Sequence, residues 1–390
     1  MRCRTITFIG PLLILLAMHT NTLAALEVTE EEKRLQRAWQ AMPAVLSRFE
    51  PLVNDFRISL QFASSEQLML TRISQHGEAL WQQAVLDAQQ QRHYDDRALY
   101  WARLMMTQAL RDWCTTQRCV DLPALEQQLE LSSRGQQSLK FSSQSDIRIL
   151  LTGFDPFLLD RNLEQSNPSG VTALMLDGWV FQHQGKQVEV QTAMIPVRFA
   201  DFDQGMIEQL LSPFLQEKRI DMLLTVSMGR EHFDLEHFPG RRRSASAPDN
   251  LNVFSGGDAN NPVIPLLGDE LLAGPEFVVY SLPYKAMMQA EGRFQINDNR
   301  SVTTLERGEF AAESLAELTD QTAVQGGGGG YLSNEISYRS ILLRDRFAPE
   351  LPVGHIHTPR IATFEPATTA DIVQQIKQML RLSVATLPDQ

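Results

Sequence analysis

Residues 147–157 read IRILLTGFDPF, and this stretch decides how the C-terminal part of the chain is organised. Its first six residues form a short apolar run typical of a buried strand, and the Phe-Asp-Pro sequence that follows is typical of a turn. Segment 171–179, after the turn, has helical character. A strand, a turn and a helix in this order favour a layered sheet whose strands alternate with helices.

The same alternation continues to the C-terminus. Further strands are expected at 188–197, 221–226, 277–280 and 353–357, and further helices at 201–215, 283–291, 331–343 and 368–383. We therefore predict a three-layer α/β/α sandwich over residues 147–390, with functional groups in loops beyond the strand ends. Segment 297–325 interrupts the alternation and is interpreted as an insertion. The five glycines at 326–330 that follow it are typical of a flexible connector.

Residues 25–135 have a different texture, rich in Gln, Glu, Leu, Ala and Arg and poor in Gly and Pro. Apolar residues recur at helical spacing in 30–49, 65–91 and 95–113. This pattern predicts a small all-helical domain in which the apolar faces of the helices pack against one another. The polar, serine-rich segment 136–146 is interpreted as a linker to the α/β domain.

Residues 1–24 are typical of a secretory signal. Arg2 and Arg4 precede an apolar run at 8–18, and small residues surround the end of the segment at Ala24. The run is shorter than the ~20 residues that span a bilayer, which favours cleavage over retention as a membrane anchor. We therefore expect an exported protein, in a bacterial periplasm or outside the cell, with no membrane contact after cleavage.

Export changes how the three cysteines are interpreted, because an oxidising compartment permits disulfides. Cys3 leaves with the signal, and Cys114 and Cys119 lie five residues apart at the end of a helical pattern. A local disulfide between them is the preferred interpretation, and two free thiols are the alternative.

Composition narrows the function classes. Apolar residues make up 43% and charged residues 21%, which is ordinary for a globular protein. The net charge of −12 argues against a nucleic-acid partner, because such binding requires a basic face that displaces counterions.

Few residues in the chain could carry chemistry, and three interpretations compete. His355 and His357 would face the same side of a strand and could bind a metal, with a third ligand from His232 or the Glu236-His237 pair. The spacing is not that of a zinc-peptidase helix, and neither a metal nor another cofactor is expected. Ser333, His357 and Glu236 could instead form a nucleophile, base and orienting acid, or all of these side chains could be structural.

A series of short motifs adds a resemblance. Residues 147–385 resemble the pyroglutamyl peptidase I family, cysteine peptidases that remove an N-terminal pyroglutamyl residue. The motifs occur in the family's order: LTGFDPF at 151–157, NPS at 167–169, IPV at 195–197, DLE at 234–236, PDN at 248–250, SLPYKAM at 281–287, GYLSN at 330–334 and HIHTP at 355–359. Nothing in the resemblance concerns the helical domain.

The resemblance implies roles for particular residues. Glu236 would orient the catalytic His357, and Ser333 occupies the position of the family's nucleophilic cysteine. Phe154 and Phe157 would pack against the lactam ring, although without the family match they could equally be core residues. Asn167 and Ser227 are expected in the same substrate pocket.

Two further features concern the oxyanion formed during the reaction. By the resemblance, Ser246 replaces the family's arginine near the reacting carbonyl. The basic run 241–243 could compensate from nearby, although an exposed basic loop is the preferred interpretation of these arginines. Backbone N–H groups around Ser333 and near 227–229 are expected to serve as oxyanion donors.

A serine nucleophile changes the chemistry, because a hydroxyl stays protonated until it attacks, so His357 would have to act as a general base. We predict hydrolysis of an N-terminal pyroglutamyl or related acyl-amide bond in a peptide or similar small amide. The alternative is a catalytically silent protein that binds blocked peptide ends or envelope fragments.

Overall fold

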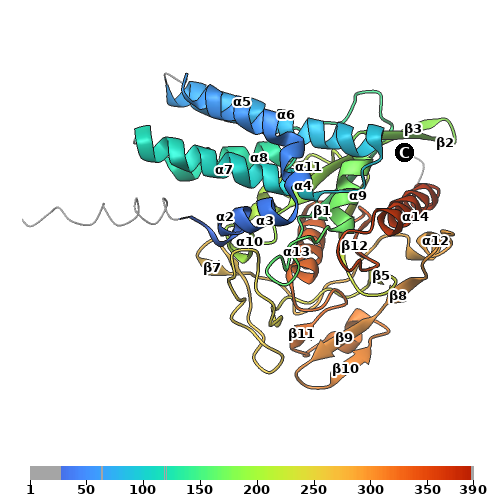
Figure 1. Ribbon diagram of the computed structural model, residues 1–390. Coiled ribbons are helices and arrows are strands. Elements are labelled where there is room, and N and C mark those ends of the chain that lie inside the picture. The colour runs from blue at the N-terminus through green and yellow to red at the C-terminus, as the bar shows by residue number, and fades with distance from the viewer. Residues whose placement is uncertain (1–27, 63–64, 118, 120, 388–390) are drawn as a thin grey trace, which may run out of the picture.

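A computed structural model describes residues 28–62, 65–117, 119 and 121–387. The expected signal, residues 1–24, lies outside the described residues. Helices α5–α8 lie at one end of the molecule and a small three-stranded sheet lies at the other, with a large mixed sheet between them (Figure 1). No helix in the described part of the chain is long and apolar enough to cross a membrane.

The N-terminal part is helical, as predicted. We call it the helical domain; its helices are α2 (Glu30–Lys33), α3 (Leu35–Ala41), α4 (Pro43–Leu46), α5 (Glu50–Leu60), α6 (Glu66–Gln91), α7 (Arg97–Gln117) and α8 (Leu122–Ser133), with a 3₁₀ turn at Ser47–Phe49. The predicted helix over 30–49 is divided into short pieces, and one of the breaks lies at Met42 because Pro43 keeps that residue out of the helical conformation. Ser65 and Asp121 cap α6 and α8 by accepting backbone N–H groups.

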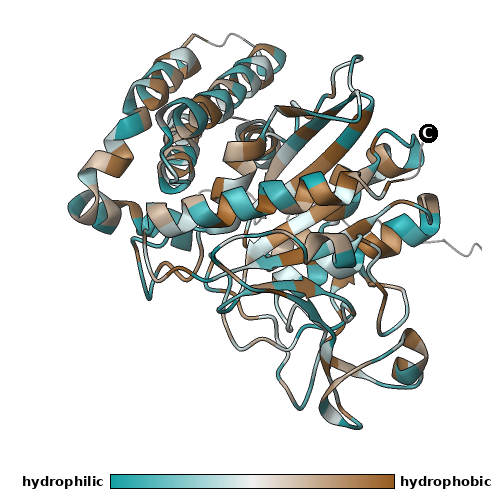
Figure 2. Ribbon diagram, turned by 90° about the vertical axis from the view of Figure 1, so that its right-hand side faces the viewer, coloured by the Kyte–Doolittle hydropathy of each residue, from teal (hydrophilic) through white to brown (hydrophobic). Residues whose placement is uncertain are grey.

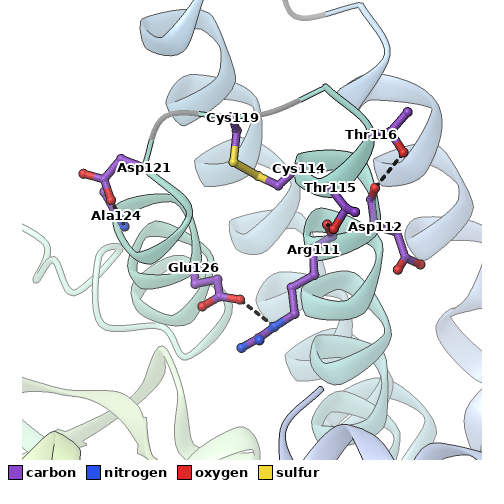
Figure 3. Close-up of a disulfide and its surroundings, with 9 residues drawn as sticks. All are labelled: Arg111, Asp112, Cys114, Thr115, Thr116, Cys119, Asp121, Ala124 and Glu126. Atoms are coloured by element: carbon purple, nitrogen blue, oxygen red, sulfur yellow. Dashed lines mark hydrogen bonds and ion pairs between the residues drawn. A yellow bond between two sulfur atoms is a disulfide. The ribbon is translucent and has the colours of Figure 1, made fainter. Parts of the chain in front are cut away.

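Cys114 and Cys119 form a disulfide, as the sequence predicted. It joins the last turns of α7 to the segment that leads into α8 (Figure 3). An ion pair between Arg111 and Glu126, with 2.7 Å between Nε and Oε1, links the same two helices further along. The two connections hold α7 and α8 at a defined distance beside the α/β domain.

The C-terminal part is built on a seven-stranded sheet in the order β2-β3-β1-β4-β12-β5-β8. Its strands are β1 (Ile147–Phe154), β2 (Trp179–His183), β3 (Lys186–Ile195), β4 (Met222–Met228), β5 (Phe233–Glu236), β8 (Ile296–Asn299) and β12 (Val353–Thr358). Strands β3, β1, β4 and β12 run parallel, whereas β5 pairs antiparallel with β12. Every residue of β12 is buried, as expected for a strand covered on both faces.

Helices cover both faces of this sheet, so the predicted α/β/α sandwich is confirmed. Helices α9 (Pro168–Leu176) and α14 (Pro366–Val384) pack together on one face, and α11 (Met206–Gln216) and α13 (Leu332–Phe347) pack together on the other. Figure 2 shows brown and white segments along the strands, between helices that carry both brown and teal residues. The short helices are α10 (Phe199–Asp203) and α12 (Tyr284–Met287).

Some predicted elements were wrong. Segment 277–280 joins no ladder and makes a single isolated bridge from Phe277 to Gly240. The helix expected at 283–291 is only the single turn α12. The short strands at 179–183, 233–236 and 296–299 were not predicted. Each has only four or five residues, too few to show a clear alternation of apolar and polar residues.

The region interpreted as an insertion forms its own small sheet, β10-β9-β11. Its strands are β9 (Ser301–Thr304), β10 (Gly308–Ala311) and β11 (Ala323–Gln325), with a 3₁₀ turn at Leu315–Leu318 and a separate small hairpin of β6 (Leu266–Leu267) and β7 (Glu270–Leu271). A second hydrophobic cluster around Phe238, Phe277 and Val302 lies beneath the small sheet.

The helical domain and the large sheet share one hydrophobic core, which includes Trp81 and Trp101 on one side and Leu150 and Val190 on the other. Buried polar contacts cross the same boundary. Among them, Asp96, at the start of α7, accepts a hydrogen bond from Ser166 Oγ at 2.7 Å. The helical domain is therefore packed against the α/β domain as a continuation of its interior.

Asp96 makes stability depend on pH. Burial raises the pKa of its carboxyl to about 8, and the hydrogen bond from Ser166 only partly opposes this. The unfolded chain releases the proton near pH 4, so the contribution of Asp96 to stability is complete below that pH and is lost as pH rises toward 8. We expect wild type to lose on the order of 1 kcal/mol per pH unit relative to Asp96→Asn between pH 5 and 7, measured by urea unfolding. A pH-independent difference between the two proteins would contradict this.

Candidate active site

Ser333 lies in the first turn of α13, directly after the glycine loop. Tyr331 precedes the helix without a side-chain cap, and the first helical hydrogen bond runs from Glu335 N to the Tyr331 carbonyl at 3.2 Å. The N–H groups of Ser333 and its helical neighbours therefore have no acceptor within the helix and carry the positive end of its dipole. Such donors suit a developing oxyanion.

The glycine loop, residues 326–330, is tightly packed, and the interpretation as a flexible connector was wrong. Gly326 and Gly329 exchange two backbone hydrogen bonds of 3.0 and 2.9 Å. A Cβ on Gly327 would lie 2.6 Å from Oε2 of Glu236, and one on Gly326 would lie 2.2 Å from Oδ1 of Asn334. Glycine is required here because the loop backbone approaches these side chains more closely than any Cβ permits.

His357 and Glu236 are brought together by the pairing of β12 with β5. His357 Nδ1 lies 2.5 Å from Glu236 Oε1, and the carboxylate is almost fully buried. Asn299, on β8, donates from Nδ2 to Glu236 Oε2 at 2.8 Å and to the Gly327 carbonyl at 3.1 Å. Burial raises the pKa of Glu236, while the adjacent His357 opposes that shift. The pair is oriented as an acid and imidazole are in a hydrolytic triad.

His355 lies deeper on the same strand and has a different environment. Its two ring nitrogens each lie 2.7 Å from a hydroxyl oxygen, of Thr225 at Nδ1 and of Ser227 at Nε2. Complete burial places the pKa of His355 well below its ordinary value, so the ring is neutral. Both nitrogens are engaged, so His355 offers no lone pair toward His357, whose ring meets it edge-on. Its two hydrogen bonds fix β12 against β4.

The other proposed metal ligands are not gathered with these histidines. His237 Nδ1 contacts Asp298 Oδ1 at 2.8 Å, and His232 lies in the loop between β4 and β5. Within the described ranges, no three His, Cys, Asp or Glu side chains are grouped as a metal site.

A cavity of about 190 Å³ opens beside Ser333. All four residues expected to bind substrate line it: Phe154, Phe157, Asn167 and Ser227. The remaining lining residues are Val197, Met228, Tyr331 and Leu332. None of the lining side chains is charged, so the cavity suits a small neutral group.

Ser333 and His357 are not hydrogen bonded to one another in the described structure. The Ser333 hydroxyl instead donates to the Gly328 carbonyl at 3.1 Å. His357 pairs in register with Ser227, which lines the cavity. The structure thus contains the acid–imidazole half of the expected triad, with the hydroxyl turned to another acceptor.

Two of the groups considered for oxyanion stabilisation have other partners, and the basic run 241–243 is not the exposed loop that the sequence suggested. The Gly229 N–H donates to the Thr358 carbonyl at 2.8 Å, so it is engaged within the sheet. The basic run 241–243 is engaged elsewhere too: Arg241 donates to the Leu272 carbonyl and Arg242 pairs with Glu276. Arg243 is buried between Glu335 and Asp203. The N–H groups at the start of α13 have no acceptor within the helix and remain candidate oxyanion donors.

Sequence reasoning missed several residues of the site. Asn299 was not found, because the strand that carries it is too short to be recognised. Val197 lies in the IPV motif at 195–197 and Tyr331 in the GYLSN motif at 330–334. Their positions in these motifs could have identified them as residues of the site. The Tyr331 ring packs against Phe157 and Phe199, and its hydroxyl donates to the Pro248 carbonyl at 2.8 Å.

Comparison with known proteins gives matches for both parts of the chain. Residues 17–130 match the family described as the PA0049 N-terminal domain, and residues 148–269 and 311–362 match the PA0049 C-terminal domain. An uncharacterized protein, PA0049 of Pseudomonas aeruginosa, is 29% identical over 383 residues, covering 74% of this chain and 69% of that protein. Residues 270–310 fall outside the C-terminal match, where the chain carries β8 and most of the small sheet.

Solved structures similar to this chain are pyrrolidone carboxyl peptidases of the hyperthermophile Pyrococcus furiosus. The enzyme described together with its cysteine-free mutant has 20% sequence identity and a TM-score of 0.43, over 62% of this chain and 100% of that one. A point mutant of the same enzyme gives the same identity, coverage and TM-score. In both its helical and its α/β parts, the chain is thus similar to the family represented by PA0049.

Proposed function

We propose that this protein is an exported hydrolase that removes an N-terminal pyroglutamyl or related acyl-amide group, with Ser333 as nucleophile. The observation that carries the proposal is the buried Glu236–His357 pair, 2.5 Å apart. His357 pairs in register with Ser227, which lines the same uncharged cavity as Ser333. The order of the sequence motifs supports the same activity, and the signal-like segment 1–24 supports export.

In the proposed reaction Ser333 Oγ attacks the acyl carbon as His357 takes the hydroxyl proton. Glu236 holds the imidazole in position and stabilises the imidazolium that forms. N–H groups at the start of α13 receive the negative oxygen of the tetrahedral intermediate. His357 then returns the proton to the departing amine, and water hydrolyses the acyl-enzyme by the same steps. The Ser333 hydroxyl must first turn away from the Gly328 carbonyl.

The cavity fits a lactam for reasons of charge as well as size. An unblocked peptide begins with an ammonium group, and burying that charge among uncharged side chains carries a large desolvation cost. Pyroglutamate has no charge at this position, and its ring can lie against Phe154 and Phe157. We therefore propose a peptide with a blocked N-terminus as the substrate.

A binding protein without catalysis is the second candidate, and one observation favours it. The Ser333 hydroxyl donates to Gly328 and not to His357, so the hydroxyl is not activated in the described conformation. In that case the same cavity would hold a blocked peptide end or an envelope fragment without cleaving it.

One assay separates the two candidates. The purified protein is incubated with a chromogenic pyroglutamyl amide and with the matched glutaminyl amide, whose amine is free. A hydrolase releases chromophore from the first substrate faster than Ser333→Ala does, and leaves the second intact. Release equal to that of Ser333→Ala, together with calorimetric binding of a pyroglutamyl peptide, would contradict hydrolysis and support the binding protein.

A further inference from the structure

We propose that the helical domain completes the candidate pocket, with Asp96 and the pair Arg103 and Arg134 as positioning residues for the two segments that line it. The inference rests on the pocket assigned under the proposed function. It goes further by giving the helical domain a task at that pocket.

The first lining segment contains Asn167 and is held by Asp96. The Asp96 carboxyl accepts from Ser166 Oγ at 2.7 Å and from the Asn167 backbone N–H at 3.2 Å, and all three residues are buried. Gly170 lies close by: a Cβ there would be 2.7 Å from Asp96 Oδ2. One side chain at the start of α7 therefore sets the backbone position of a pocket residue.

The second lining segment contains Phe154 and Phe157, and Asp155 between them is held by two arginines. The Asp155 carboxylate accepts hydrogen bonds from Arg103 Nη1 at 3.1 Å and from Arg134 Nη1 at 2.6 Å. Asp155 and both guanidinium groups are at most 3% exposed. A buried charged pair of this kind holds its geometry strictly, because separating the partners leaves an uncompensated charge away from water.

The two lining segments are also joined to each other. Asn167 Nδ2 donates to the Asp155 carbonyl at 2.9 Å, so a shift at either residue is passed to the other. Arg97 adds a contact from the helical domain to the same connection, donating to the Glu164 carbonyl at 3.2 Å.

These anchors matter because the connection itself is long. Residues 155–167 join β1 to α9 and contain no helix or strand. A connection of this length has considerable freedom when its backbone is not tied down. Contacts from α7 and from Arg134, directly after α8, supply the ties, so the cavity depends on a part of the chain that forms none of its walls.

Hydrogen–deuterium exchange of the purified protein tests this directly. Asp96→Ala removes the acceptor for Ser166 and Asn167, and we expect amides in 155–170 to exchange at least tenfold faster than in wild type. Asp96→Asn keeps a carbonyl oxygen at the same place and should restore exchange to within about threefold of wild type. Asp112→Ala is the matched control, because Asp112 is an exposed aspartate on the same helix (Figure 3).

Steady-state kinetics give a second readout. If the protein hydrolyses the pyroglutamyl amide, Asp96→Ala should raise KM at least tenfold with kcat changed less than threefold, because the pocket is loosened and the reacting groups are untouched. Asp96→Asn should restore KM. A fall in kcat with KM unchanged would overturn the positioning role.

The exchange rates do not depend on whether the protein is an enzyme. This test can therefore be carried out even if the hydrolase proposal fails. If Asp96→Ala does not fold, Ser166→Ala removes only one of the two hydrogen bonds and should give an intermediate acceleration confined to 155–170. Exchange in this segment equal to that of Asp112→Ala, for Asp96→Ala or for Ser166→Ala, would overturn the proposal.

Discussion

Replacing Ser333 with alanine is expected to lower the rate of hydrolysis of a pyroglutamyl amide by a factor of about 10³ or more. The remaining rate would come only from substrate binding and from stabilisation of the oxyanion. The Ser333 hydroxyl oxygen is the atom that forms the acyl-enzyme. The other two hydroxyls among the lining residues are engaged, Ser227 with His355 and Tyr331 with the Pro248 carbonyl. Unfolding midpoints should remain close to wild type, because the lost hydroxyl makes a single hydrogen bond to Gly328.

Ser333→Cys sharpens this result. A thiol at the start of α13 lies at the positive end of a helix dipole and near an imidazole, two features that favour thiolate formation. We therefore expect the cysteine variant to hydrolyse at least as fast as wild type, since a thiolate needs no general base at the moment of attack. Activity in Ser333→Cys alone would show a site that is competent and held silent by its serine.

Alkylation gives a measure that does not depend on any substrate. Expressed without residues 1–25, the protein retains only the two disulfide-bonded cysteines, so the introduced thiol is the one that reacts with iodoacetamide. Its rate at pH 6 to 7 should exceed that of Ser65→Cys, a control at the exposed N-terminus of α6. Equal rates would argue against activation by His357.

The second large effect is expected for Glu236→Gln. The substitution keeps the shape of the side chain and removes the charge that stabilises imidazolium, so kcat should fall by about 10² to 10⁴. An amide at this position also presents an N–H where Nδ1–H of His357 needs an acceptor, which favours the wrong tautomer. KM should change little, since Glu236 does not line the cavity.

The chain offers a matched control for this change. Asp298 and His237 form a second carboxylate–imidazole pair, 2.8 Å apart, on the neighbouring strand and segment. Neither residue lines the cavity. Asp298→Asn should therefore leave kcat within about threefold of wild type, and an equal loss in the two variants would contradict a specific role for Glu236.

Much of the architecture could be predicted from local pattern. Strands β1 and β4 contain apolar runs, and helices α6 and α7 repeat apolar residues over many turns, so these elements are visible in the sequence. Strands β5 and β8 could not be predicted because each has four residues. They carry Glu236 and Asn299, so the weakest local signals of the fold lie at the candidate site.

The conformation of the glycine loop could not be predicted from its composition. Five consecutive glycines predict flexibility, because the unfolded segment has the greatest backbone freedom. In the folded protein the same absence of side chains allows the loop to pack against Glu236 and Asn334. Local sequence cannot distinguish these outcomes, since the difference lies in what the rest of the chain places beside the loop.

The sequence by itself determined the longer strands and helices, the disulfide partners five residues apart, and the order of the motifs that contain Ser333, Glu236 and His357. Each of these depends on residues close together along the chain. Only the tertiary structure decided that Glu236 meets His357 across 121 residues, that the Ser333 hydroxyl turns to Gly328, and that Asp96 holds Asn167. These contacts depend on strand pairing and on buried hydrogen bonds between distant segments, and no local periodicity encodes them.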